Sequence, residues 1–155
     1  IRPEKPFLDT TDADWHRVLN VDLNAVFYGC RAALPGMVSN NWGRIINLTG
    51  MNAIHGYSGR APVSAAKHGV WGLTKALAKE FGPSGITVNA ISPGPIRPEH
   101  DDPIQSQHLH GQVGRIPLGH LGEPRHIASL CVYLISDGGG FVSGQMIACN
   151  GAAET

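Results

Sequence analysis

The sequence predicts an α/β protein, a partial doubly wound parallel sheet of three strands with flanking helices, formed by residues 1–155 as a single domain. Two observations predict this fold class. Three helical patterns alternate along the chain with three short β-rich segments, and this order gives parallel strands joined by right-handed crossovers. The β-rich segments are mainly apolar, which is typical of strands that are buried on both faces.

The first helix is expected over residues 12–38. Thr11 suits the N-cap position, and the carboxylate of Asp14 follows three residues later, near the positive end of the helix dipole. Apolar residues then recur at steps of three and four. Asp22 interrupts this apolar stripe, and a buried carboxylate needs a partner because burying it alone is costly.

The middle of the chain is predicted to form a strand, a helix and a second strand. Residues 44–49 form a short apolar segment between glycines, as expected of a buried parallel strand. Residues 63–81 have helical periodicity and end at a Gly-Pro pair. Residues 86–91 are rich in β-branched side chains and predict the second strand.

The last part of the chain contains a long irregular segment and one more helix and strand. Residues 96–122 combine histidines, prolines and glycines, and long excursions of this kind are usually functional. The third helix is expected to begin at Pro124, since proline suits the first helical position, and to end near residue 135. Residues 145–149 predict the third strand.

Composition excludes several classes of function. Twelve basic and twelve acidic residues leave a net charge of zero, so the basic excess that nucleic acids or anionic membranes require is missing. Charged residues make up only 15% of the chain, which favours a surface partly covered by a partner, and we expect a homo-oligomer. Three widely spaced cysteines predict neither a disulfide framework nor a metal site. This pattern, with no membrane-spanning apolar run, favours the cytoplasm.

Several sequence blocks occur in an order that resembles the C-terminal part of the short-chain dehydrogenases/reductases. The blocks are VDLNAVF at 21–27, GRIIN at 43–47, SAAKHGV at 64–70, GITVNAISPGPI at 85–96, IPLG at 116–119 and GQ at 144–145. This resemblance implies a Rossmann-like fold and an oxidoreductase that uses NAD or NADP. The glycine-rich phosphate turn of the family precedes these blocks and is not in this sequence, so we expect a truncated or degenerate member.

The family resemblance also implies three catalytic positions that this sequence has changed. The family has a tyrosine four residues before the lysine that corresponds to Lys67, a serine thirteen residues before the tyrosine, and an asparagine on the preceding helix. Those positions hold Val63, Gly50 and Asp22 here. Valine and glycine have no proton to donate, so we expect the isolated chain to be inactive as a reductase.

The lysine of the family is kept, and two nearby residues offer partial substitutes for the lost hydroxyls. Lys67 has a structural interpretation, in which Asp22 pairs with it across two helices, and a catalytic one. Thr49 supplies a hydroxyl beside the serine position. Tyr57 supplies a phenol, although it lies ten residues from the lysine rather than four, and its alternative role is to pack on the end of the sheet.

The resemblance assigns a remnant of a cofactor site to Lys67, Pro93, Gly94 and Ile96. Pro98 lies near a place where the family often has a threonine that binds the carboxamide. We therefore expect the isolated chain to bind no cofactor, whereas the parent family uses NAD or NADP. Substrate choice would depend on residues 96–114, and a small-molecule ligand remains a hypothesis.

Two further patterns have alternative interpretations. Ser64 and Lys67 have the SxxK spacing by which a serine and a lysine share a helical face in some hydrolases, so a repurposed esterase is one hypothesis. Metal-ligand residue types gather in one loop, but they lack a fixed ligand spacing and read as solvated side chains, so no metal site is predicted. They are Glu99, His100, Asp101, Asp102, His108 and His110.

Three functions therefore remain open from the sequence. The chain is an assembly or binding module, a part of a dehydrogenase whose other half binds the cofactor, or a hydrolase. Self-association is expected through helices 12–38 and 63–81, and through the open edge of strand 44–49. The small residues on these helices would allow close approach of two chains, and they are Gly29, Ala33, Ala66 and Gly69.

Overall fold

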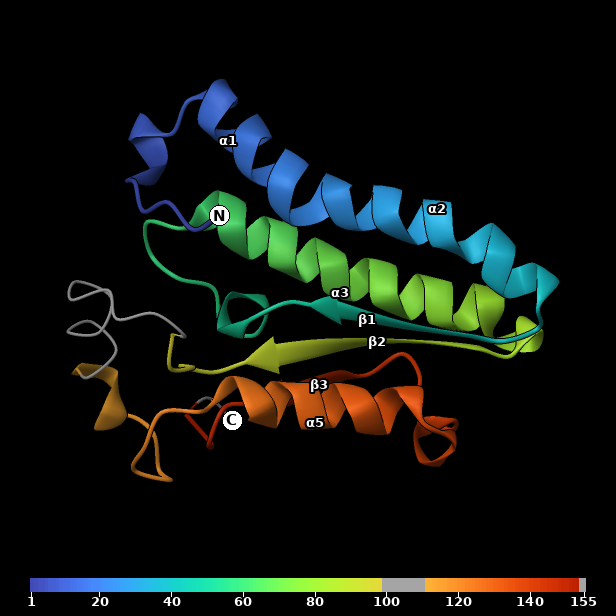
Figure 1. Ribbon diagram of the computed structural model, residues 1–155. Helices are drawn as coiled ribbons and strands as arrows, with labels where there is room; N and C mark the ends of the chain where they lie inside the picture. The colour runs from blue at the N-terminus through green and yellow to red at the C-terminus, as the bar shows by residue number, and fades with distance from the viewer. Residues whose placement is uncertain (99–110, 154–155) are drawn as a thin grey trace.

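The computed structural model describes residues 1–98 and 111–153 and shows a three-stranded sheet between two helical layers (Figure 1). The helices are α1 (Asp12–Leu19), α2 (Ala25–Ser39), α3 (Ala61–Phe81) and α5 (Pro124–Ile135), and the strands are β1 (Gly43–Leu48), β2 (Ile86–Pro93) and β3 (Met146–Cys149). Helices α1, α2 and α3 lie on one side of the sheet and α5 lies on the other. The predicted α/β fold class is confirmed.

All three strands are parallel, in the order β1-β2-β3. The register pairs Gly43 with Ile86 at one end of β1 and Leu48 with Ile91 at the other. Within the described residues β1 pairs with β2 alone, so it is an edge strand, as expected. The carboxyl ends of all three strands point toward the same end of the sheet (Figure 1).

The first helical segment begins where the sequence predicts and contains a feature that the sequence did not reveal. Thr11 caps α1, because its hydroxyl accepts a hydrogen bond from the Asp14 amide while the Asp14 carboxylate accepts from the Thr11 amide. Between α1 and α2 the helix widens into a π-helical turn, Asn20–Asn24. A π turn contains one extra residue per turn, and such turns occur frequently at functional sites.

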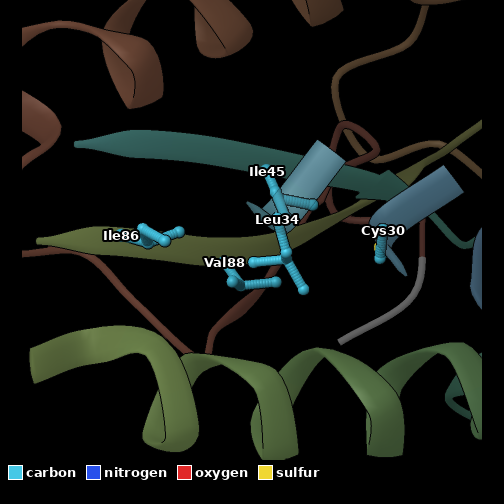
Figure 2. Packing of buried hydrophobic residues seen from close by; sticks show 5 residues of the cluster. All are labelled: Cys30, Leu34, Ile45, Ile86 and Val88. Atoms are coloured by element: carbon cyan, nitrogen blue, oxygen red, sulfur yellow. The ribbon is translucent and has the colours of Figure 1, made fainter. Parts of the chain in front are cut away.

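The core consists of two groups of buried side chains. Figure 2 shows the larger cluster, which α2 and the first two strands contribute: Cys30, Leu34, Ile45, Ile86 and Val88. A second cluster joins Val18 of α1 to Val63 and Ala66 of α3. These contacts hold α1 and α3 together next to the π-helical turn.

Two of the four small residues expected at an interface between chains pack within one chain instead, Ala66 fully buried and Gly69 half-buried. Ala66 is buried in the second cluster, and a methyl group added to Gly69 would lie 3.0 Å from the side chain of Leu23. Both residues therefore allow the π-helical turn and α1 to approach α3 within one chain. Gly29 and Ala33 are exposed on α2, as expected.

The cap of α1 predicts an acid-dependent loss of stability. The Lys5 ammonium 2.6 Å away, together with the hydrogen bonds of Thr11, lowers the pKa of Asp14 to about 2 from an ordinary value of 3.8. A carboxyl group whose pKa is lowered on folding stabilises the folded state above its unfolded pKa, and this stabilisation disappears as the pH falls through the folded pKa.

We therefore expect Asp14→Asn to lower the unfolding free energy above pH 4, with a difference from the parent chain that shrinks as the pH approaches 2. Urea unfolding at a series of pH values measures the difference. Asp12→Asn is the matched control, because it removes a carboxylate from the same helical turn and leaves the capping box intact. A difference that is independent of pH would contradict the prediction.

Candidate functional site

A buried carboxylate occupies the π-helical turn. The side chain of Asp22 is 5% exposed, and its Oδ1 accepts a hydrogen bond from the backbone nitrogen of Ile1 at 2.7 Å. Its second oxygen, Oδ2, is buried and has no hydrogen-bond partner in the part of the chain that the structure describes. Leaving a buried carboxylate oxygen without a hydrogen-bond donor costs free energy, so Asp22 is an unusual residue in this structure.

Asp22 lines a cavity of about 480 Å³ at the carboxyl ends of β1 and β2. Three segments provide much of its wall. Residues 49–52 follow β1, Val63 and Lys67 come from α3, and residues 93–96 begin at the last residue of β2. Clefts outside the carboxyl ends of parallel strands are the usual position of ligand sites in open α/β sheets.

The structure corrects the expected pairing of Lys67 with Asp22. The ammonium group of Lys67 donates to the backbone carbonyl of Leu48 at 3.4 Å. The carboxylate of Asp22 instead accepts from Ile1, and both side chains line the same cavity without forming an ion pair within 4.0 Å in the described structure. The side chain of Lys67 reaches the carbonyl at the end of β1, which satisfies one of its three donors.

The two positions that the family resemblance assigns to proton transfer also line the cavity. Val63 is 1% exposed and packs in the second core cluster, and Gly50 has a φ of 155° and a ψ of 173°. This backbone conformation favours glycine, so a serine at position 50 would be strained. The nearby hydroxyl of Thr49 donates to the carbonyl of Ile91 at 3.1 Å, so its hydrogen is already used.

Tyr57 and Ser64 are placed differently with respect to the cavity. Tyr57 lines it, with the Arg60 guanidinium 5.7 Å from the centre of its ring, and that guanidinium also pairs with Glu4 at 2.7 Å. The hydroxyl of Ser64 accepts a hydrogen bond from the Tyr57 amide at 3.3 Å, and Ser64 is not part of the described cavity wall. The structure therefore brings Tyr57 and Lys67 to one cavity, whereas the hydroxyl of Ser64 contacts the backbone of the loop that contains Tyr57.

The residues assigned to a cofactor remnant meet at the cavity. Lys67, Pro93, Gly94 and Ile96 all line it. The Gly94 amide donates to the carbonyl of Cys149 at 3.0 Å, and a methyl group added to Gly94 would lie 2.6 Å from the Cα atom of Asn150. Only glycine lets these two backbone segments approach so closely.

The family resemblance assigns these four residues to one end of a dinucleotide. In that assignment Lys67 and the segment after β2 would hold a ribose and the ring attached to it. A pyrophosphate needs backbone amides of a glycine-rich turn at a helix N-terminus. In residues 1–98 and 111–153, no strand leads directly through such a turn into a helix, so the described residues do not provide that part of a cofactor site.

The six metal-type residues between Glu99 and His110 lie outside the described residues. The described residues contain no group of three or more potential ligands that could hold a metal ion. They also contain no helix that is long and apolar enough to cross a membrane.

Sequence reasoning missed two features of the cavity. The π-helical turn has no distinctive pattern, because an extra residue in one turn hardly alters the spacing of the apolar stripe. Arg60 and Arg115 also line the cavity, and both come from segments without periodicity.

Comparison with known proteins identifies the class of this fold and site. A family model described as enoyl-(acyl carrier protein) reductase matches residues 1–152. The chain belongs to the short-chain dehydrogenase/reductase family, which uses NAD or NADP.

Among its relatives is the acetoacetyl-CoA reductase of Shinella zoogloeoides, 41% identical over 97% of this chain and 63% of that protein. The 3-oxoacyl-(acyl-carrier-protein) reductase FabG of Pseudomonas aeruginosa is 39% identical over 90% of this chain and 57% of that protein. A solved 4-hydroxyisoleucine dehydrogenase complexed with NADH superimposes with a TM-score of 0.86 at 33% identity, covering 97% of this chain and 64% of that one. The chain thus spans about three fifths of the length of these proteins.

The close approach at Gly94 predicts a local packing requirement. We expect Gly94→Ala to lower the unfolding free energy by about 1–3 kcal/mol, because the new methyl group collides with Asn150. Gly72→Ala is the control: nothing lies within 4 Å of the added methyl group on α3, so this variant should be neutral or up to about 1 kcal/mol more stable. Chemical denaturation measures both, and equal stabilities would contradict the prediction.

Proposed function

We propose that this chain carries a dehydrogenase cavity whose proton-transfer side chains have been lost, and that it acts as a binding or assembly module rather than as a carbonyl reductase. One observation supports this proposal above others. Val63 and Gly50 line the same cavity as Lys67, at the positions where the family resemblance assigns a tyrosine and a serine. The argument depends on side chains that are present, so it holds equally for a longer protein that contains this chain.

The expected loss of rate is large. Proton transfer by a positioned acid contributes about 10²–10⁴ to a rate. A donor to the developing oxyanion contributes about 10²–10³ more. Lys67 remains, but it cannot replace both groups, since one ammonium would have to donate to the oxygen and bind the ribose as well.

The principal alternative is that the chain is part of a working dehydrogenase whose other half binds the cofactor. The relatives that it matches support this alternative, because the chain spans about three fifths of their length. In that case Tyr57 would have to supply the proton, since it is the phenol of the described cavity wall. The hydrolase alternative requires Ser64 to act with Lys67, although their hydrogen bonds run to different partners.

We expect neither the chain nor a longer form of it to reduce acetoacetyl thioesters with NADPH or NADH above the rate without protein. Absorbance of the reduced nucleotide measures the reaction, and calorimetric titration of the isolated chain with each nucleotide should show no micromolar affinity. Reduction that Lys67→Ala abolishes would contradict the proposal, and its loss in Tyr57→Phe would identify the proton donor. Ester hydrolysis that Ser64→Ala stops would favour the hydrolase instead.

We also propose that the chain forms a homo-oligomer through α2 and α3 and the edge of β1. The exposed side of α2 presents large side chains, and Arg31 stacks over the rings of Phe27 and Tyr28 at 5.1 and 5.7 Å. Exposed aromatic groups of this kind mark association surfaces.

Sedimentation velocity should therefore show a species larger than a monomer at micromolar concentration. Tyr28→Lys should shift it toward the monomer, because it places a charge on the exposed side of α2. Tyr133→Lys is the control, since Tyr133 on α5 has a similar exposure, 48% against 55% for Tyr28. A stable monomer of the unmodified chain would refute the proposed association.

A further inference from the structure

A second cavity lies beside the start of α5, at the carboxyl ends of β2 and β3. Its volume is about 370 Å³, which is within the range of sites that hold small molecules. Pro95, Ile96 and Leu118 give it an apolar wall, and His120 and His126 add two imidazole rings. Among the described residues it shares Pro95 and Ile96 with the cavity that contains Asp22 and no others, so the two cavities lie on either side of this segment.

Backbone contacts hold the walls of the second cavity in place. The segment that follows β2 pairs with the segment that precedes α5, because the Gly122 amide donates to the carbonyl of Pro95 at 2.9 Å and the Arg97 amide donates to the carbonyl of Gly122 at 2.8 Å. At another point of the wall the Leu118 amide donates to the carbonyl of Gly151 at 3.4 Å. The cavity is therefore formed before any ligand enters it, as is usual for small-molecule sites.

The two histidines of this wall differ in the nitrogen that carries the hydrogen. Nδ1 of His126 accepts a hydrogen bond from the Glu123 amide at 3.0 Å, in the cap of α5. A ring nitrogen that accepts has no hydrogen, so Nε2 of His126 is a donor. Nδ1 of His120 lies 2.9 Å from the carbonyl oxygen of Leu121, which can only accept, so this nitrogen carries the hydrogen. Nε2 of a neutral His120 is then an acceptor.

The wall favours an uncharged ligand. None of the described residues that line this cavity has a carboxylate, an ammonium or a guanidinium group. Nearby, the guanidinium of Arg97 and the carboxylate of Glu123 already pair with each other at 3.0 Å. An ion that entered the cavity would lose hydration without gaining an opposite charge, which is costly. The best ligand is therefore mainly apolar, with one polar group that both donates and accepts a hydrogen bond.

We propose that the second cavity binds an uncharged phenol. The aromatic ring lies among Pro95, Ile96 and Leu118, and the hydroxyl group donates to Nε2 of His120 while it accepts from Nε2 of His126. A phenol satisfies both rings because its single oxygen donates one hydrogen bond and accepts others. This inference goes beyond the proposed function, since it assigns a ligand to a cavity that the proposed function does not use.

Three matched aromatic molecules test the proposal on the chain without any nucleotide: phenol, anisole and toluene. Phenol donates and accepts, anisole only accepts, and toluene does neither. Titrations near pH 7.5 keep imidazole groups mainly neutral. Because one net hydrogen bond is worth about fivefold in affinity, phenol should bind at least that much more tightly than anisole or toluene. NMR titration measures each affinity, and phenol should shift the amide signals of Ile96, Leu118 and His120.

Variants assign the preference to the two rings. His120→Phe removes the acceptor, so the affinity for phenol should fall to that for anisole, while the affinity for anisole should not change. His126→Gln removes the ring but keeps an acceptor for the Glu123 amide, so it should weaken phenol and anisole alike. His16→Phe is the matched control and should change neither affinity, because His16 is exposed on α1, on the other side of the sheet from α5 (Figure 1).

Equal affinities of the unmodified chain for the three molecules would overturn the inference, and this result needs no variant to fold. An absence of shifts at the second cavity with about 10 mM phenol would overturn it too, since a ligand of this size should bind with about millimolar affinity. Shifts confined to residues 49–52, in the wall of the first cavity, or a preference for phenol that survives in His120→Phe would also contradict it. The proposed function is tested separately, by turnover with a nucleotide present.

Discussion

The parallel pairing of β1 with β2 is the constraint on which the site depends. With Leu48 opposite Ile91, the segments that leave the two strands emerge side by side, at residues 49–52 and 93–96. The Thr49 amide and hydroxyl both bond to the carbonyl of Ile91, which joins the two exits. A shift of this register by one residue would turn the strand side chains to opposite faces and separate the two walls of the cavity.

The π-helical turn contributes one buried carboxylate, that of Asp22, to the cavity. An ordinary helix through 20–24 would satisfy its backbone more regularly, so the wider turn costs some regular hydrogen bonding. Its packing is specific: Leu23 fits against Gly69, and Val18 fits against Val63 and Ala66. These contacts press the turn onto α3 and hold the buried carboxylate of Asp22 at the wall of the cavity that Lys67 also lines.

The sequence was sufficient to predict the elements because their apolar periodicity reflects burial against a single sheet. The strand expected at 44–49 runs from Gly43 to Leu48, and the helix expected at 63–81 begins at Ala61. The partner of Lys67 could not be predicted, since it depends on whether a flexible side chain reaches Leu48 or Asp22 in three dimensions. The sequence did not predict Arg115 as a cavity residue for a similar reason, because only the folding of a segment without periodicity brings it to the cavity.

Packing fixes the walls of the cavity. Position 94 has no room for a side chain, because a methyl group there would collide with the backbone of Asn150. Val63 belongs to the core cluster that joins α3 to α1. Val63 therefore contributes to the stability of the fold as well as to the wall of the cavity. The φ of Gly50, 155°, departs from the conformations that serine favours. A serine introduced at position 50 would therefore need a change in the local backbone, and a tyrosine introduced at position 63 would need the core around Val18 and Ala66 to adjust.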